Sequence, residues 1–166
     1  MAGESALDRA LATAWHVHAS VAEVTARGDA KASIALSAEL ALAAVAVARL
    51  GSPPPHETAL SKGLLYVGAV LLMLASLFAL SAVLPRLAAP VPPGELLYFG
   101  ALRHWDAREL PAALRDADAL ESLSEQLVTM SRIAWRKHRL VAHSLRVSVL
   151  GLLCLGVAAL IPVLPN

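Results

Sequence analysis

The sequence contains little charge and almost no cysteine. Charged residues make up 16% of its 166 residues and the net charge is +1, so the chain lacks the basic excess of nucleic-acid modules and we expect no nucleic-acid partner. The single cysteine, Cys154, excludes an internal disulfide framework and a multi-cysteine zinc site. The first thirty residues contain no unbroken apolar stretch of the kind that forms a signal-peptide core.

Signatures of catalysis and metal binding are also missing. The sequence has no HExxH motif, no nucleophile elbow and no phosphate-binding P-loop. The spacing of His16 and His18 fits no common metal motif. We therefore expect no enzyme, no metal and no cofactor. No segment alternates as a strand does, so the predicted fold class is all-α.

Hydrophobic residues are abundant instead, at 57% of the chain, which is more than one small soluble core can bury. Two uncharged runs, residues 64–84 and 147–164, are long enough to cross roughly 30 Å of hydrocarbon as helices. A third run, residues 33–50, contains Glu39, and a carboxylate at the centre of a span costs on the order of 3 kcal/mol. We predict three transmembrane helices.

Lysine and arginine predict the orientation, because they resist translocation. An N-terminus inside the cell places all but two of the 14 cationic residues in the cytoplasm and leaves only Arg49 and Lys62 outside. We therefore expect a multi-pass protein of the bacterial inner membrane. Its single domain, residues 1–166, would consist of a cytoplasmic helix (1–30), span 1 (33–50), span 2 (64–84), a cytoplasmic connector and long helix (85–146) and span 3 (147–164).

The cytoplasmic segments show helical periodicity. An N-terminal face before Gly28 comprises Leu7, Leu11, Trp15, His18, Val21 and Thr25. A heptad-like seam that continues into the last span comprises Leu123, Leu127, Met130, Ala134, Lys137, Val141 and Ser144. We expect one long helix from about Ala107 into the membrane, packed on the N-terminal helix.

Cationic side chains form a second stripe opposite that seam. Its members are Arg132, Arg136, Arg139, His143 and Arg146. The stripe is either a solvated face near anionic headgroups or a ligand-binding face. Lys137 differs because it lies in the apolar seam, where an unpaired ammonium is costly. It must extend to the interface, pair with an acid such as Asp29 or meet an anionic ligand.

Four segments, in order along the chain, resemble the Pycsar membrane effectors. They are RGDAKASIAL at 27–36, LSAVLP at 80–85, LYFG at 97–100 and EQLVTMSRIAWRK at 125–137. The chain departs from the family pattern at His138, where an aromatic residue is expected. The resemblance implies an antiphage effector that senses a cyclic pyrimidine nucleotide, cyclic UMP or cyclic CMP, made by a partner pyrimidine nucleotide cyclase. The resemblance further implies that the effector then impairs the lipid bilayer, so that the infected cell dies by abortive infection.

The resemblance, together with the chemistry of such a ligand, indicates candidate ligand-binding residues. They are Asp29, Lys31, Tyr98, Phe99, Gln126, Trp135 and Lys137. The lysines would neutralise the phosphate, the glutamine would read a base edge and an aromatic residue would stack on the base. Alternatively, Asp29 and Lys31 form an interfacial charge pair that sets the depth of the first span.

Glu39 also has two interpretations. It is either a polar element repacked between protomers of a homo-oligomer, since three spans are too few to enclose a pore, or it makes a structural hydrogen bond to Ser37 or Ser76. The alternative function is a non-enzymatic membrane adaptor that binds a protein partner through its cytoplasmic helices. A membrane-permeabilising protein without a nucleotide sensor is a third possibility.

Overall fold

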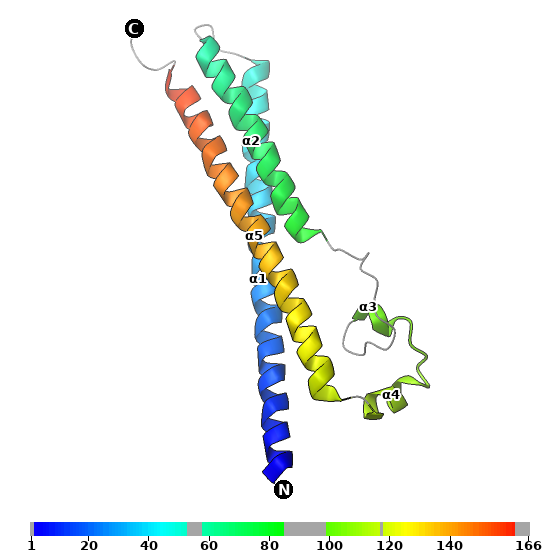
Figure 1. Cartoon of the computed structure of the whole chain (residues 1–166). Helices are drawn as coiled ribbons and strands as arrows, with labels where there is room; N and C mark the ends of the chain where they lie inside the picture. Colours follow the sequence, from blue (N-terminus) through cyan, green and yellow to red (C-terminus); the bar gives the residue numbers. More distant parts are fainter. Residues whose placement is uncertain (1, 53–57, 85–98, 117, 162–166) are drawn as a thin grey trace. The chain divides into compact units, whose positions relative to one another are not determined.

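The chain is helical throughout the parts that the structure describes. The structure is a computed structural model and describes residues 2–52, 58–84, 99–116 and 118–161, which contain no strand. The helices are α1 (Ala2–Gly51), α2 (Ala59–Val83), α3 (Phe99–Leu102), α4 (Leu110–Asp116) and α5 (Ala119–Leu160) (Figure 1). The predicted all-α class is therefore confirmed.

Within the described ranges, three helices are long and apolar enough to cross a membrane: α1, α2 and α5. The expected cytoplasmic helix over 1–30 and the span over 33–50 are parts of one helix, α1, which continues through Gly28. As predicted, the last span is continuous with the helix that precedes it, because α5 extends over 42 residues. The division of these helices into cytoplasmic and membrane segments stays a prediction.

The start of the last long helix differs from the prediction. A single helix from about Ala107 was expected, whereas α4 and α5 are separate helices. The side chain of Asp118 accounts for the new start, since its Oδ1 accepts hydrogen bonds from the backbone N–H groups of Leu120 at 3.0 Å and Glu121 at 3.1 Å. Asp118 thus caps the first turn of α5.

Two other helix ends also differ from the predicted bounds. Helix α2 begins at Ala59 rather than at residue 64, because Oγ1 of Thr58 accepts a hydrogen bond from the Ser61 N–H and caps it. Helix α5 ends at Leu160, and the last residues of the predicted third span, 162–164, lie outside the described residues.

The chain divides into two compact units, and α1 and α5 each contribute to both. Unit 1 comprises Met1–Ala26 and Pro85–Trp135, and unit 2 comprises Arg27–Leu84 and Arg136–Asn166. Buried apolar side chains in the described part of unit 1 are Ala14, Ala101, Leu123 and Ala134. Of the predicted N-terminal face, Leu7 and Trp15 are exposed, whereas its other members are half-buried. The packing of this segment as a cytoplasmic extension stays a prediction.

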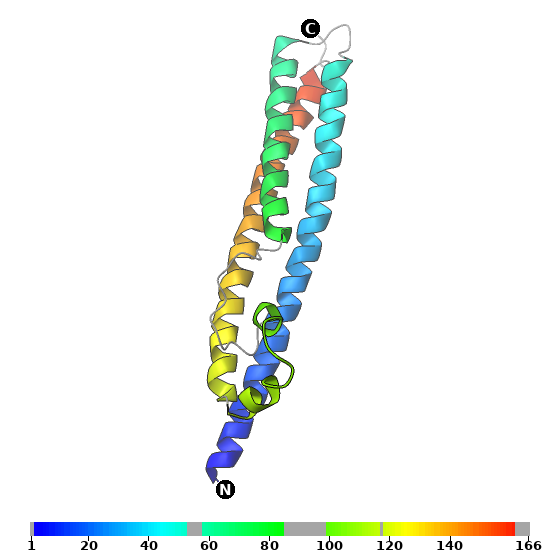
Figure 2. The ribbon, with the colours of Figure 1, turned by 90° about the vertical axis from the view of Figure 1, so that its right-hand side faces the viewer.

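Unit 2 is a bundle of three helices, in which the parts of α1 and α5 run parallel and α2 runs antiparallel to both (Figures 1 and 2). The contacts between α1 and α5 fix their register. Asp29 contacts Lys137, and Glu39, ten residues further along α1, contacts Ser148, eleven residues further along α5. Polar side chains therefore meet at two levels along this helix pair.

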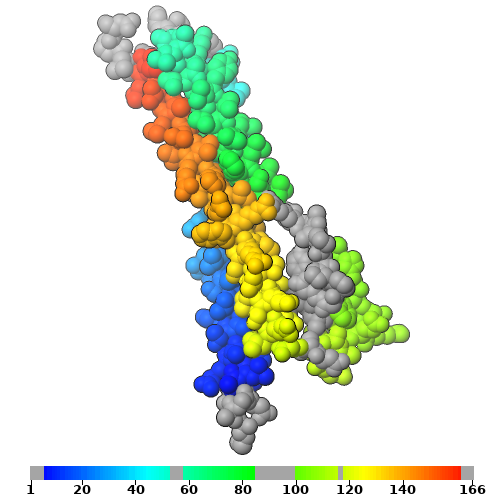
Figure 3. Space-filling view, in the orientation of Figure 1, coloured from blue at the N-terminus to red at the C-terminus, as the bar shows by residue number. Residues whose placement is uncertain are grey.

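Small residues bring α2 and α5 together in unit 2. A Cβ atom added at Gly68 would lie 2.7 Å from Cδ2 of Leu155 and 3.1 Å from the backbone oxygen of Gly151. The buried hydroxyl of Ser61 donates a hydrogen bond of 2.9 Å to the carbonyl oxygen of Ala158. Close backbone approach and interhelical hydrogen bonds are the forces that hold helices together in lipid. In Figure 3 the surfaces of α2 (green) and α5 (orange) lie against each other.

Candidate functional site

An ion pair joins α1 and α5 at one level of unit 2. Nζ of Lys137 donates to both carboxylate oxygens of Asp29, at 2.8 Å and 2.7 Å. The exposed fractions of the Lys137 and Asp29 side chains are 25% and 36%. The pair is therefore only partly buried. The predicted pairing of Lys137 with Asp29 is confirmed.

The neighbours of this pair also lie against each other. A Cβ atom added at Gly28 would lie 3.3 Å from Cε1 of His138 and 3.7 Å from its Nε2, so the absence of a side chain on α1 leaves room for the imidazole. At His138, where an aromatic residue was expected, the imidazole ring therefore lies against Gly28 of α1.

Lys31 does not join this cluster. It lies two residues beyond Asp29, which is about 200° around a helix, and its side chain is exposed. Among the residues that the structure describes, none forms an ion pair with Lys31, and the Asp29 carboxylate instead binds Lys137. The structure thus brings Asp29 and Lys137 together and places Lys31 on another face of α1.

The candidates for base recognition that the structure describes belong to unit 1. Gln126 is 8% exposed, and its Oε1 has no hydrogen-bond partner in the described part of the chain. Trp135 is 70% exposed. Phe99 is the first residue of α3, and Tyr98 lies outside the described residues. Their contacts with a base stay predictions.

A second polar cluster lies further along α1 and α5. Glu39 is buried, and its Oε1 accepts hydrogen bonds from the hydroxyl of Ser144 at 2.6 Å and from the hydroxyl of Ser148. Its other oxygen, Oε2, is buried without a hydrogen-bond partner among the described residues. The carboxyl group of the first predicted span is therefore held between helices by two serines of the last one.

The predicted structural partners of Glu39 were wrong. Ser37 and Ser76 each donate to the carbonyl oxygen four residues earlier in their own helix. The sequence contained a partial signal for the observed partners: if Asp29 pairs with Lys137 and the helices are parallel, a residue ten positions after Asp29 lies at the level of residue 147 on α5, because both helices rise by the same length per residue. Ser144 and Ser148 flank that position, one turn apart.

The cationic stripe of α5 lies outside both clusters. Arg136, Arg139, His143 and Arg146 are exposed in unit 2, and the His143 ring lies 6.0 Å from the ring of Phe78 on α2. Over the described ranges, no group of three or more His, Cys, Asp or Glu side chains is arranged to hold a metal ion.

Comparison with known families matches nearly the whole chain. The family model described as Pycsar effector protein domain covers residues 13–164 of the 166. No curated protein and no solved structure matches the chain. The matched segment contains every candidate site residue and all of α2 and α5. Membership indicates a membrane-associated effector of the Pycsar antiphage system with a cyclic nucleotide signal. The chain therefore belongs to the Pycsar effector family.

Proposed function

We propose that this effector senses a cyclic pyrimidine nucleotide, cyclic UMP or cyclic CMP, and then impairs the inner membrane, which causes abortive infection. A pyrimidine nucleotide cyclase is the proposed partner that supplies the ligand. The observation that carries the proposal is the partly exposed ion pair between Asp29 and Lys137, which joins two helices that are each long and apolar enough to span a membrane. A charged ligand that enters this pair acts directly on the packing of those helices.

The phosphate of the ligand is proposed to exchange with Asp29 at Lys137. A cyclic nucleotide carries one phosphate charge, and an ammonium group has three donors but no acceptor. A second anion beside the Asp29 carboxylate is repelled, so ligand binding favours release of Asp29. A partly exposed ion pair contributes at most about 1 kcal/mol, which a phosphate contact can replace.

The base is assigned to the residues that the family resemblance implies. Oε1 of Gln126, which has no hydrogen-bond partner among the described residues, supports this assignment, because it can accept a hydrogen bond from the ring N–H of uracil or the amino group of cytosine. Trp135, Tyr98 and Phe99 are the proposed stacking residues. Lys31 is proposed to attract the phosphate through its charge rather than through the Asp29 cluster.

The membrane effect is proposed to follow from repacking of α1 against α5. Glu39 lies ten residues beyond Asp29, or about 15 Å along the helix, and its two serine contacts join the same two helices. Loss of the Asp29 contact lets α1 shift, and Glu39 then contacts another protomer. Three spans cannot enclose a pore, so the active form is proposed to be a homo-oligomer.

Calorimetric titration of the detergent-solubilised protein with cyclic UMP, cyclic CMP and cyclic AMP tests the sensor. We expect Lys137→Gln to weaken binding of a cyclic pyrimidine nucleotide about tenfold, since charge-assisted hydrogen bonds are lost. Lys31→Gln removes the same charge from another face and should weaken binding less. Asp29→Asn removes the competing anion, so it should tighten binding by up to about fivefold.

Several outcomes of this titration would contradict the proposal. Weaker binding by Asp29→Asn would refute the exchange, and unchanged binding by both lysine variants would refute the phosphate site. Absence of binding to all three nucleotides would favour the adaptor. Dye release from liposomes tests the effector step: release that occurs without nucleotide would contradict sensing, and a strictly monomeric active state would contradict the homo-oligomer.

A further inference from the structure

A groove of about 380 Å³ lies in unit 2, at the level where α1 ends and α2 begins. Its lining comes from all three helices of the bundle and consists of Leu42, Val45, Ala46, Arg49, Leu65, Leu152, Leu155, Gly156, Ala158 and Ala159. Small residues keep the α5 side of the groove open: a Cβ atom added at Gly156 would meet nothing within 4 Å. The groove is therefore lined mostly by apolar side chains and has open space beside Gly156.

The described lining of the groove contains one cationic residue, Arg49. Arg49 lies in the last turn of α1, is exposed and lines the groove. None of the described lining residues is acidic, and the described part of the chain provides no carboxylate partner for Arg49. A guanidinium group binds phosphate through two parallel hydrogen bonds. The groove thus offers an apolar surface and a phosphate-binding group side by side.

We propose that this groove binds one anionic phospholipid, with an acyl chain along Gly156 and Ala159 and the headgroup phosphate on Arg49. Charge complementarity selects this occupant. A phospholipid satisfies both the apolar lining and the Arg49 guanidinium, for which the described residues supply no anion, whereas an apolar helix of a second copy would cover Arg49 without supplying one. The site is separate from the Asp29 and Glu39 clusters, and it gives the bundle a specific lipid requirement.

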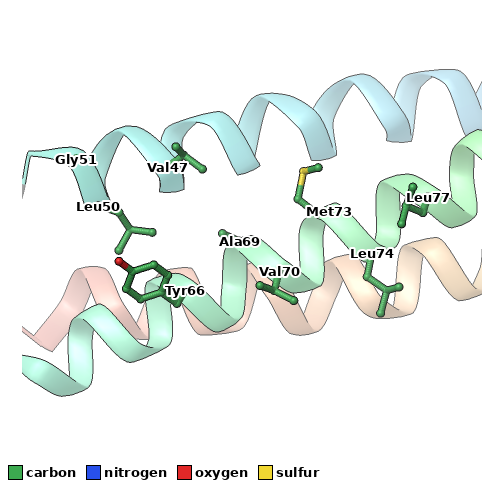
Figure 4. Close-up of a pocket in the computed structure, with 9 residues that line it drawn as sticks. All are labelled: Val47, Leu50, Gly51, Tyr66, Ala69, Val70, Met73, Leu74 and Leu77. Atoms are coloured by element: carbon green, nitrogen blue, oxygen red, sulfur yellow. The ribbon is translucent and has the colours of Figure 1, made fainter.

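The neighbouring groove between α1 and α2 shows the contrast. It is larger, at about 760 Å³, and its lining includes Val47, Leu50, Tyr66, Met73 and Leu77 (Figure 4). None of the described residues that line it is charged. Acyl chains can fill such a surface, but nothing in it selects a headgroup. Arg49 is what distinguishes the smaller groove.

Native mass spectrometry of the full chain in mixed micelles with phosphatidylglycerol or phosphatidylcholine tests the proposal. We expect the wild type to retain one phosphatidylglycerol, and Arg49→Gln to retain it about tenfold more weakly. Gly156→Leu should block retention by filling the groove. Lys62→Gln and Gly63→Leu are the matched controls: Lys62 is an exposed cation near the start of α2, outside the groove lining, and a Cβ atom added at Gly63 also meets nothing within 4 Å.

The same spectra contain the outcomes that overturn the proposal. Equal retention by Arg49→Gln and wild type, or unchanged retention by Gly156→Leu, would exclude the site. An equal loss in Lys62→Gln would show general attraction to a cationic surface. A lipid-free dimer that Gly156→Leu dissociates would assign the groove to a second copy. Circular dichroism of each variant verifies that the helices have formed.

Discussion

At the scale of single residues, the most unusual feature is the Glu39 carboxyl group. It is buried in α1, and it receives both of its hydrogen bonds on one oxygen. A buried acceptor without a donor costs about 1–3 kcal/mol, whereas hydrogen bonds between membrane helices contribute only about 0.6 kcal/mol each. The cluster therefore contributes little net stability, which fits the proposed role of Glu39 in a change of packing.

We predict that Ser144→Ala with Ser148→Ala destabilises the bundle by about 1–3 kcal/mol, because Glu39 then stays buried without donors. Adding Glu39→Leu to this pair should restore stability to within about 1 kcal/mol of wild type, since no polar group is left unpaired. Unfolding in sodium dodecyl sulfate, followed by circular dichroism, measures both effects. Ser81→Ala is the control, because its hydroxyl bonds only to its own helix. A triple variant as unstable as the double variant would contradict the account.

At the scale of helices, the contact between α2 and α5 depends on glycines, which have no side chain to keep the two backbones apart. Gly68 and Gly151 face each other, and a Cβ atom at Gly151 would lie 3.1 Å from Cγ of Leu72 and 3.2 Å from the Gly68 oxygen. Buried residues of α2 are mostly small, with alanine at 69, 75, 79 and 82. Lipid supplies no hydrophobic drive between helices, so close approach of their backbones supplies the attraction.

We predict that Gly68→Ala destabilises the bundle by about 1–3 kcal/mol, because the new methyl group overlaps Leu155 and approaches the Gly151 carbonyl. Gly63→Ala lies in open space on the same helix, and it should stabilise α2 by up to about 1 kcal/mol through its higher helix propensity. Unfolding in sodium dodecyl sulfate, followed by circular dichroism, measures the stability of both variants. If both variants change stability equally, close packing at Gly68 is not what joins α2 to α5.

At the scale of the whole molecule, the protein combines three apolar helices with an asymmetric distribution of cations. Lysine and arginine on the cytoplasmic side anchor such helices in one direction. An N-terminus inside the cell places the Asp29 cluster towards the cytoplasm, where a cyclase would release its product. The orientation is therefore a requirement of the proposed sensor, and it can be tested without a ligand.

We predict that Ser20→Cys reacts with a membrane-impermeant maleimide only from the cytoplasmic side, and Ser52→Cys only from outside. Both side chains are exposed, and the charge distribution predicts that they lie on opposite sides of the membrane. Each substitution is made together with Cys154→Ser, which removes the native thiol and its background labelling. Intact cells and inverted vesicles give the two accessibilities. Labelling of Ser20→Cys in intact cells would refute both the topology and the internal sensor.

Much of the fold could be predicted from the sequence, because a long uncharged run by itself indicates a helix that can cross lipid, whatever the rest of the chain does. The runs at 64–84 and 147–164 predicted α2 and the end of α5 for this reason, and the seam before the last span is buried or half-buried throughout. The start of α5 was missed because the prediction began the long helix at about Ala107, whereas the residue that caps α5 is Asp118.

The sequence by itself determined the family, the helical class and the apolar spans, since these depend on residue type and on spacing within one helix. It also supplied the Asp29 and Lys137 pair as one alternative. Only the tertiary structure decided that this pair forms, that Glu39 bonds to Ser144 and Ser148, and that Lys31 lies apart. The reason is physical. A serine hydroxyl can always donate to a carbonyl oxygen of its own helix, so the sequence does not show which serines bond across helices. The register between α1 and α5 decides which of them reach Glu39.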